Sequence, residues 1–132
     1  MRVTNANVEP IIEHGGTCRT FFLVPKESMR KQTEGSYLEF VCEFEIAARS
    51  RLDPHKHDTH EYYYVLTGRA TMQVGSEKRE IKPGDLIYIP PNVVHSIAPL
   101  DGKPVRSLAF AASFLPEGGS GLDAERAELP EQ

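Results

Sequence analysis

Hydrophobic and polar residues alternate most clearly between residues 37 and 46. Nearly every second side chain there is apolar, and most of those in between are glutamates. An alternation with a period of two is typical of a β-strand with one buried face. A weaker alternation of the same kind occupies residues 69–74. The buried faces of these two strands are expected to carry Leu38, Phe40, Cys42, Phe44 and Ile46, and then Ala70, Met72 and Val74.

Turn signals divide the central region into short segments. They recur at intervals of roughly 8 to 12 residues, a spacing found in β-sandwiches and barrels. No stretch between residues 37 and 114 has a convincing helical period, and ten prolines and ten glycines disfavour long helices. The chain is therefore predicted to be all-β. The turn signals are Thr67-Gly68, Gly75-Ser76-Glu77, Lys82-Pro83-Gly84-Asp85, Pro90-Pro91-Asn92 and Asp101-Gly102-Lys103-Pro104.

Both flanks of this region differ from it. Before it, the apolar run from Phe21 to Val24 ends at Pro25 and predicts a strand that lies either along the barrel or against a partner subunit. After Phe114 the chain is rich in Pro, Gly, Ser, Glu and Asp, so we expect a flexible tail with at most a short helix at 123–129. We divide the chain into an N-terminal segment (1–36), a β-barrel (37–114) and a tail (115–132).

Length, charge and cysteine content narrow the functional classes. The 132 residues suit one domain, and the net charge of −4 with scattered basic residues argues against a nucleic-acid partner. No apolar stretch reaches the roughly 20 residues of a membrane span, and no secretory signal is evident, so we expect a cytoplasmic protein without a membrane partner. Cys18 and Cys42 lack a C-x-x-C spacing and are interpreted as small buried side chains.

Three of the five histidines lie between residues 55 and 60. On a strand, His55 and His57 point to the same face, so the pair can chelate a metal ion. Glu61 has the same parity and offers a carboxylate oxygen beside the two imidazoles, and His95 offers a further ligand after a Pro-rich turn. His60 has the opposite parity and is expected beside the ligands or facing solvent.

These residues also carry a family resemblance. The stretch His55-x-His57-x3-Glu61-x6-Gly68 resembles the first motif of the cupin superfamily, and Gly84-x5-Pro90 with His95 resembles the second. The chain is thus similar to a small single-domain cupin of the cupin-2 type. The resemblance implies a double-stranded β-helix, or jelly-roll barrel, in which His55, His57, Glu61 and His95 bind one divalent metal ion.

Three positions depart from the cupin pattern. The glycine expected six residues before the first histidine is Arg49, and the glycine expected after the proline of the second motif is Asn92. Asn92 also tolerates a left-handed backbone and can occupy the same turn. Pro99 stands where an asparagine is usual. None of the three is a proposed ligand, so the departures concern the loops around the site.

Three His and one Glu leave about two positions of an octahedral ion open to a substrate or dioxygen. The resemblance therefore predicts a metal-dependent enzyme (Mn, Fe, Ni or Zn) that acts on a small organic molecule as a dioxygenase, a lyase or decarboxylase, or an isomerase. Glu61 or a tyrosine would handle a proton, and Tyr63 shares the parity of Glu61. The alternative is a non-catalytic module that binds a small acid or sugar, for example as a sensor.

The remaining candidates are peripheral. Arg49 and Arg51 lie on the approach to the first motif and could grip a substrate carboxylate, although solvated surface arginines are commoner. His14 is interpreted as a surface or otherwise satisfied side chain without a role. Small cupins usually pair, so we expect a homodimer in which the run from Phe21 to Val24 supplies the pairing surface.

Overall fold

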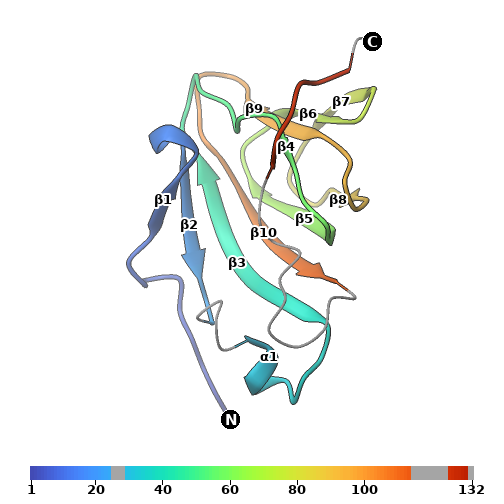
Figure 1. Ribbon diagram of the computed structural model, residues 1–132. Coiled ribbons are helices and arrows are strands. Elements are labelled where there is room, and N and C mark those ends of the chain that lie inside the picture. Colours follow the sequence, from blue (N-terminus) through green and yellow to red (C-terminus); the bar gives the residue numbers. More distant parts are fainter. Residues whose placement is uncertain (25–28, 114–124, 131–132) are drawn as a thin grey trace.

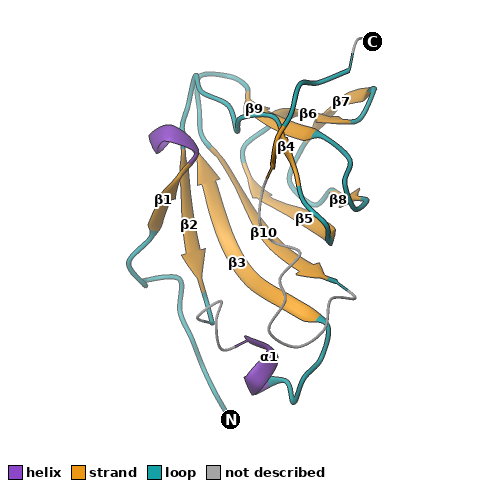
Figure 2. Cartoon of the chain, viewed as in Figure 1, coloured by secondary structure: helices purple, strands orange, loops and turns teal. Residues whose placement is uncertain are grey.

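The computed structural model describes residues 1–24, 29–113 and 125–130, and it consists almost entirely of antiparallel strands (Figure 2). The helical content of this part is a 3-10 turn η1 (His14–Gly16) and one turn of α-helix, α1 (Met29–Gln32). None of the described helices is long or apolar enough to cross a membrane. The strands are β1 (Ile11–Glu13), β2 (Cys18–Phe22), β3 (Leu38–Ile46), β4 (His55–Lys56), β5 (His60–Thr67), β6 (Ala70–Val74), β7 (Glu77–Ile81), β8 (Leu86–Ile89), β9 (His95–Pro99), β10 (Val105–Ala112) and β11 (Glu125–Arg126).

The strands form two sheets. One has the order β1-β2-β3-β10-β5-β8 and the other the order β11-β4-β9-β6-β7. Figure 1 shows the long strands β3 and β10 side by side, with β2 and β1 continuing the sheet beyond β3. The predicted all-β jelly-roll is confirmed, because strands distant in the sequence pair across each sheet instead of following the chain order.

The predicted alternation places the core. In β3 the side chains of Phe40, Cys42, Phe44 and Ile46 are buried, as their parity requires. Glu39 is an exception, because it is also buried and accepts a hydrogen bond from the Ser113 hydroxyl. The fully buried side chains at the centre are mostly branched aliphatic ones, which suit a barrel interior: Val65, Ile89, Ile97 and Val105 together with Ile46.

The N-terminal residues contribute to the first sheet. Cys18 lies opposite Ile46, and Phe22 lies opposite Cys42, so β2 runs along β3 of the same chain. Phe21 points to the outer face, where the Arg106 guanidinium lies 4.4 Å from its ring centroid. Part of the run from Phe21 to Val24 is therefore covered within the chain itself. The division at residues 36 and 114 and the pairing of subunits stay predictions.

The described residues near the C-terminus include a short strand that the sequence did not indicate. No helix occupies the part of 123–129 that is described, residues 125–129, and instead β11 pairs antiparallel with β4. Residues 123 and 124 lie outside the described residues. The backbone of β4 would otherwise be a sheet edge, and an edge strand readily accepts a short partner. The tail thus reaches the segment that carries His55.

Gly68 closes the turn between β5 and β6. Its φ is +82°, and a Cβ built on it would lie 2.3 Å from the carbonyl oxygen of Pro104 and 3.0 Å from the Cα of Val105. These are backbone atoms that cannot move aside cheaply. Only glycine therefore allows this close approach between the β5–β6 turn and the start of β10.

We expect Gly68→Ala to lower the free energy of unfolding by at least about 3 kcal/mol, because it adds a backbone clash to a left-handed backbone. Gly84→Ala is the matched control: φ is +91° there, and nothing lies within 4 Å of the new Cβ. That variant should lose only about 1 to 2 kcal/mol. Urea unfolding followed by circular dichroism measures both, and equal losses would contradict the clash.

Candidate metal centre

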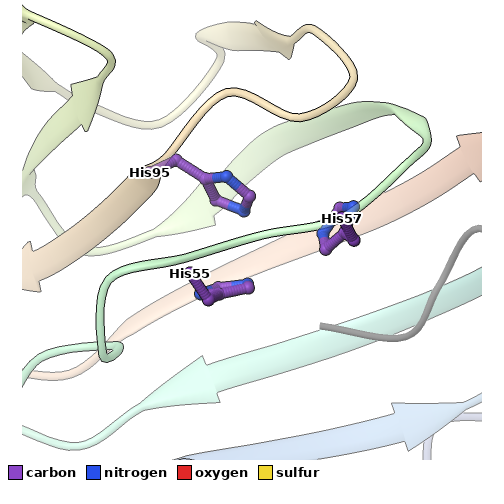
Figure 3. Close-up of side chains that lie close together, drawn as sticks. All are labelled: His55, His57 and His95. Atoms are coloured by element: carbon purple, nitrogen blue, oxygen red, sulfur yellow. The ribbon is translucent and has the colours of Figure 1, made fainter. Parts of the chain in front are cut away.

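Two short segments bring the three histidines together. In β4 His55 lies opposite His95, the first residue of β9, and His57 follows one residue after β4 ends. The predicted strand through both His55 and His57 is thus shorter than expected, yet the two side chains still face the same interior. Figure 3 shows the three imidazoles gathered between these segments. One nitrogen from each ring lies within 4.8 Å of the others.

Backbone hydrogen bonds fix the segment that leads to His55. The Leu52 amide donates to the Ile97 carbonyl at 2.9 Å, and the Ser96 hydroxyl donates to the Leu52 carbonyl at 2.6 Å. On the other side, the Asn92 amide donates to the His57 carbonyl at 2.9 Å. The two halves of the histidine group are therefore held together by contacts that do not involve their rings.

The Nδ1 atom of each imidazole forms a hydrogen bond with a partner outside the three-histidine group. Nδ1 of His55 lies 2.7 Å from the Asp53 carbonyl, and Nδ1 of His95 lies 2.9 Å from the Val93 carbonyl. A carbonyl only accepts, so both rings carry the proton on Nδ1 and present a lone pair on Nε2. Nδ1 of His57 is 2.6 Å from the fully buried Thr59 hydroxyl. Such outer partners set ring orientation and tautomer at metal sites.

The Nε2 atom of His95 is the unpaired group of the site. His95 is 0% exposed, and this atom has no hydrogen-bond partner in the described part of the chain. Burial lowers the pKa of His55 to about 3, with repulsion from His95 adding to the effect. Burial also lowers the pKa of His95, against the opposing charge of Glu61. Both rings are neutral at neutral pH, which is the form that binds metal ions.

Glu61 and Tyr63 project from β5 toward the same interior. The Glu61 Oε2 atom lies 2.8 Å from Nε2 of His57. Burial acts to raise the pKa of Glu61, but the hydrogen bond and charge of His57 outweigh it and leave the pKa below its ordinary value. Tyr63 is also bonded to Glu61, and burial together with that carboxylate raises its pKa well above the usual range. Glu61 is thus a carboxylate, and Tyr63 keeps its proton.

A cavity of about 270 Å³ opens beside this cluster. Its wall mixes polar side chains with apolar and aromatic ones. Sequence reasoning identified the histidine end but not the contribution of the N-terminal residues. The lining residues outside the cluster are Glu13, His14, Cys18, Thr20, Phe22, Phe40, Cys42, Phe44, Leu52 and Ala109.

His14 lies next to the histidine group, a position that the sequence did not indicate. Its ring centroid lies 4.8 Å from that of His55, and its side chain forms part of the cavity wall. The nearby Gly15-Gly16 pair was the one local sign of a tight turn at this histidine. The approach of His14 to His55 depends on the pairing of β2 with β3, which no local sequence pattern specifies.

The other candidates lie away from the cavity. His60 faces outward, where its Nδ1 atom is 2.7 Å from the Tyr88 hydroxyl. Tyr62 also faces outward and stacks on Phe110 with ring centroids 5.1 Å apart. Neither Arg49 nor Arg51 lines the histidine cavity.

The two residues that stand in place of motif glycines, Arg49 and Asn92, both keep a left-handed backbone. Arg49 has a φ of 59°, as does Asn92. Asn92 also donates from its side-chain amide to Asp58 at 3.1 Å, which ties the two loops beside the histidines. The turns expected of the motifs are therefore retained without glycine.

The model of the Cupin_2 family, described as a cupin domain, matches residues 42–110, which include the three histidines and Glu61. The chain belongs to the cupin family.

Curated relatives of this cupin match parts of it. A protein from Methanocaldococcus jannaschii is 47% identical over 55 residues, which are 41% of this chain and 44% of that protein. A protein from Streptomyces coelicolor is 30% identical over 86 residues, 58% of this chain and 80% of that protein. Quercetin 2,3-dioxygenase from Bacillus subtilis is 34% identical over 68 residues, 51% of this chain and 20% of the enzyme. The match thus spans less than half of the first and third of these proteins.

Solved structures share the fold of this cupin. A predicted oxalate decarboxylase from Thermotoga maritima has a TM-score of 0.74 and 21% identity, with 86% of this chain and 100% of that chain covered. The polyketide cyclase RemF from Streptomyces resistomycificus has a TM-score of 0.72 and 22% identity, with 99% and 87% covered. At these identities the likeness concerns the barrel alone.

The two cysteines of the cavity wall should be chemically inert. Burial raises the pKa of Cys18 to about 11, and it raises that of Cys42 further. Because the thiolate is the reactive form, we expect iodoacetamide at pH 8 to alkylate the folded protein roughly 100-fold more slowly than the urea-unfolded chain. Intact-mass spectrometry over time measures this ratio. Equal rates in the two states would show that the thiols are accessible.

Proposed function

We propose that this cupin is a metal-dependent enzyme that acts on a small organic molecule, with His55, His57, His95 and Glu61 as ligands of one divalent ion. The observation that carries the proposal is the buried Nε2 of His95, which has no partner among the described residues. Leaving such a group unpaired costs about 1 to 3 kcal/mol. A bound cation would remove that cost.

The donor set fits a divalent transition metal. Three imidazoles and one carboxylate suit Mn, Fe, Ni or Zn. The Nδ1 atoms are engaged elsewhere, so one nitrogen of each ring remains for the common site. Ligation by His57 and Glu61 would replace the hydrogen bond that now joins Nε2 and Oε2.

A divalent ion in this position would polarise a carbonyl, carboxylate or enolate oxygen of the substrate. Tyr63 is the residue placed to move a proton, because its buried hydroxyl donates to Glu61 and remains protonated at neutral pH. Tyr63 and Glu61 therefore form the proton-handling pair of the proposed enzyme.

The relatives support small-molecule chemistry without selecting one reaction. They include a quercetin 2,3-dioxygenase and, by fold, a predicted oxalate decarboxylase and a polyketide cyclase. We propose a dioxygenase or a lyase-type activity. Substrate screening of Fe(II)-, Mn(II)-, Ni(II)- and Zn(II)-loaded protein separates the two, because only a dioxygenase consumes dioxygen. Binding without turnover in every case would favour the non-catalytic sensor.

Metal content provides the first test. We expect His55→Ala, His57→Ala and His95→Ala to lose most of the bound metal, measured by inductively coupled plasma mass spectrometry after purification. His60→Ala is the matched control, since its ring faces the Tyr88 hydroxyl outside the cavity, and it should retain near-stoichiometric metal. Chelation should also lower the melting temperature of the wild type, because metal binds only the folded site. A loaded His95→Ala protein would refute the ligand assignment.

Proton handling is tested separately from metal binding. We expect Tyr63→Phe to reduce kcat by roughly 100-fold or more while metal content stays unchanged. Tyr62→Phe changes the neighbouring residue on the outer face and should leave kcat within about twofold of the wild type. Steady-state kinetics on the substrate found by the screen measures both variants. Equal kcat values for the two would remove Tyr63 from the mechanism.

A further inference from the structure

The first hairpin of the chain supplies a wall of the cavity that lies outside the matched cupin domain. Glu13 ends β1, His14 begins η1, and Thr20 lies in β2, and all three residues line the cavity. The hairpin is fixed to the barrel through Thr17, whose carbonyl accepts from the Ala47 amide at 3.0 Å and whose hydroxyl lies 3.1 Å from the Arg51 carbonyl. Its side chains therefore keep a defined position relative to His55.

The turn in this hairpin has an unfavourable backbone that places His14 in the wall. His14, Gly15 and Gly16 have φ values of 51°, 66° and 91°. The left-handed conformation is uncommon for a residue with a Cβ, and it persists where surrounding contacts impose it. The Thr17 hydroxyl donates to the His14 carbonyl at 2.8 Å and closes the turn. The result is an imidazole packed beside that of His55.

Glu13 presents a hydrogen-bond acceptor at the mouth of the cavity. The buried Thr20 hydroxyl donates to its Oε2 atom at 2.6 Å, and the Cys18 sulfur lies 3.6 Å behind that hydroxyl. The other oxygen, Oε1, has no partner within the described ranges. A carboxylate held in this way accepts from a hydroxyl and repels a second anion. Glu13 is thus a polar group of the cavity wall that does not belong to the three-histidine group.

The cavity beside these polar groups suits one substituted aromatic ring. A volume of about 270 Å³ equals that of about nine water molecules. The walls include Phe22, Phe40 and Phe44, and aromatic rings favour edge and stacked contacts with one another. The cavity wall therefore combines aromatic side chains with the clustered histidines and the carboxylate of Glu13.

We propose that Glu13, oriented by Thr20, is a specificity-determining residue that selects a small aromatic substrate with a hydroxyl group at one end and an acidic oxygen at the other. The acidic oxygen would lie at the three-histidine end, so this inference rests on the proposed function. The hydroxyl would donate to Oε1 of Glu13. A second carboxylate in place of the hydroxyl would be rejected.

Four probes test this selection by isothermal titration calorimetry: benzoate, 3-hydroxybenzoate, 4-hydroxybenzoate and terephthalate. With the Zn(II)-loaded wild type, we expect at least one hydroxybenzoate to bind roughly tenfold more tightly than benzoate, and terephthalate to bind most weakly. In Glu13→Gln the hydroxyl preference should fall below roughly threefold, and terephthalate should gain affinity. Glu77→Gln, an exposed carboxylate in β7, is the matched control and should behave as the wild type.

The outcomes separate this inference from the proposed function. Metal content of the same samples reports on the ligand set, and titration of the metal-free protein reports on the hairpin alone. Loaded protein that shows no hydroxyl preference, a preference that survives Glu13→Gln, or no binding of any probe at millimolar concentration would overturn the inference. A Glu13-dependent preference in protein that takes up no metal would support it while contradicting the proposed function.

Discussion

An imidazole or a carboxylate removed from water is destabilising unless its polar atoms find partners, and this barrel buries three imidazoles and the carboxylate of Glu61 around one site. Much of the local structure around the site provides hydrogen-bond partners for these buried groups. Asp53 and Val93 offer backbone carbonyls to two rings, and Thr59 offers a hydroxyl to the third. Each partner lies two residues from its histidine. The loops beside the site are thereby shaped by the hydrogen bonds that the rings need.

The same loops show that a turn depends on backbone conformation and not on glycine as such. Arg49 and Asn92 both take the left-handed conformation although each carries a Cβ. Asparagine does so readily, and here its side-chain amide also donates to Asp58. Arg49 is exposed, so its side chain meets no steric penalty from packing. Gly68 differs, because the backbone of Pro104 occupies the space where a Cβ would lie.

Alternation along the sequence predicted which side chains of a strand face the interior. It did not predict positions that depend on the pairing of strands far apart in the chain. Alternation along β3 and β5 placed Phe44, Glu61 and Tyr63 in the interior, and it placed His60 outside. Residue spacing then identified the three histidines that lie together. Glu13 and His14 could not be found in this way, since they reach the cavity only because β2 pairs with β3. The short β11 was missed for the same reason: its partner strand, β4, lies about 70 residues away in the chain.

The histidine group and Glu13 differ in how much the stability of the fold depends on them. His95 is fully buried and lies opposite His55 in the sheet, so a change there disturbs packing, hydrogen bonding and the proposed ligand set together. Glu13 is exposed, and in the described chain its carboxylate accepts one hydrogen bond, from Thr20. Exposed positions of this kind usually change stability by less than about 0.5 kcal/mol when substituted. A barrel built in this way can alter which molecule it binds through its first hairpin while the buried histidine group remains intact.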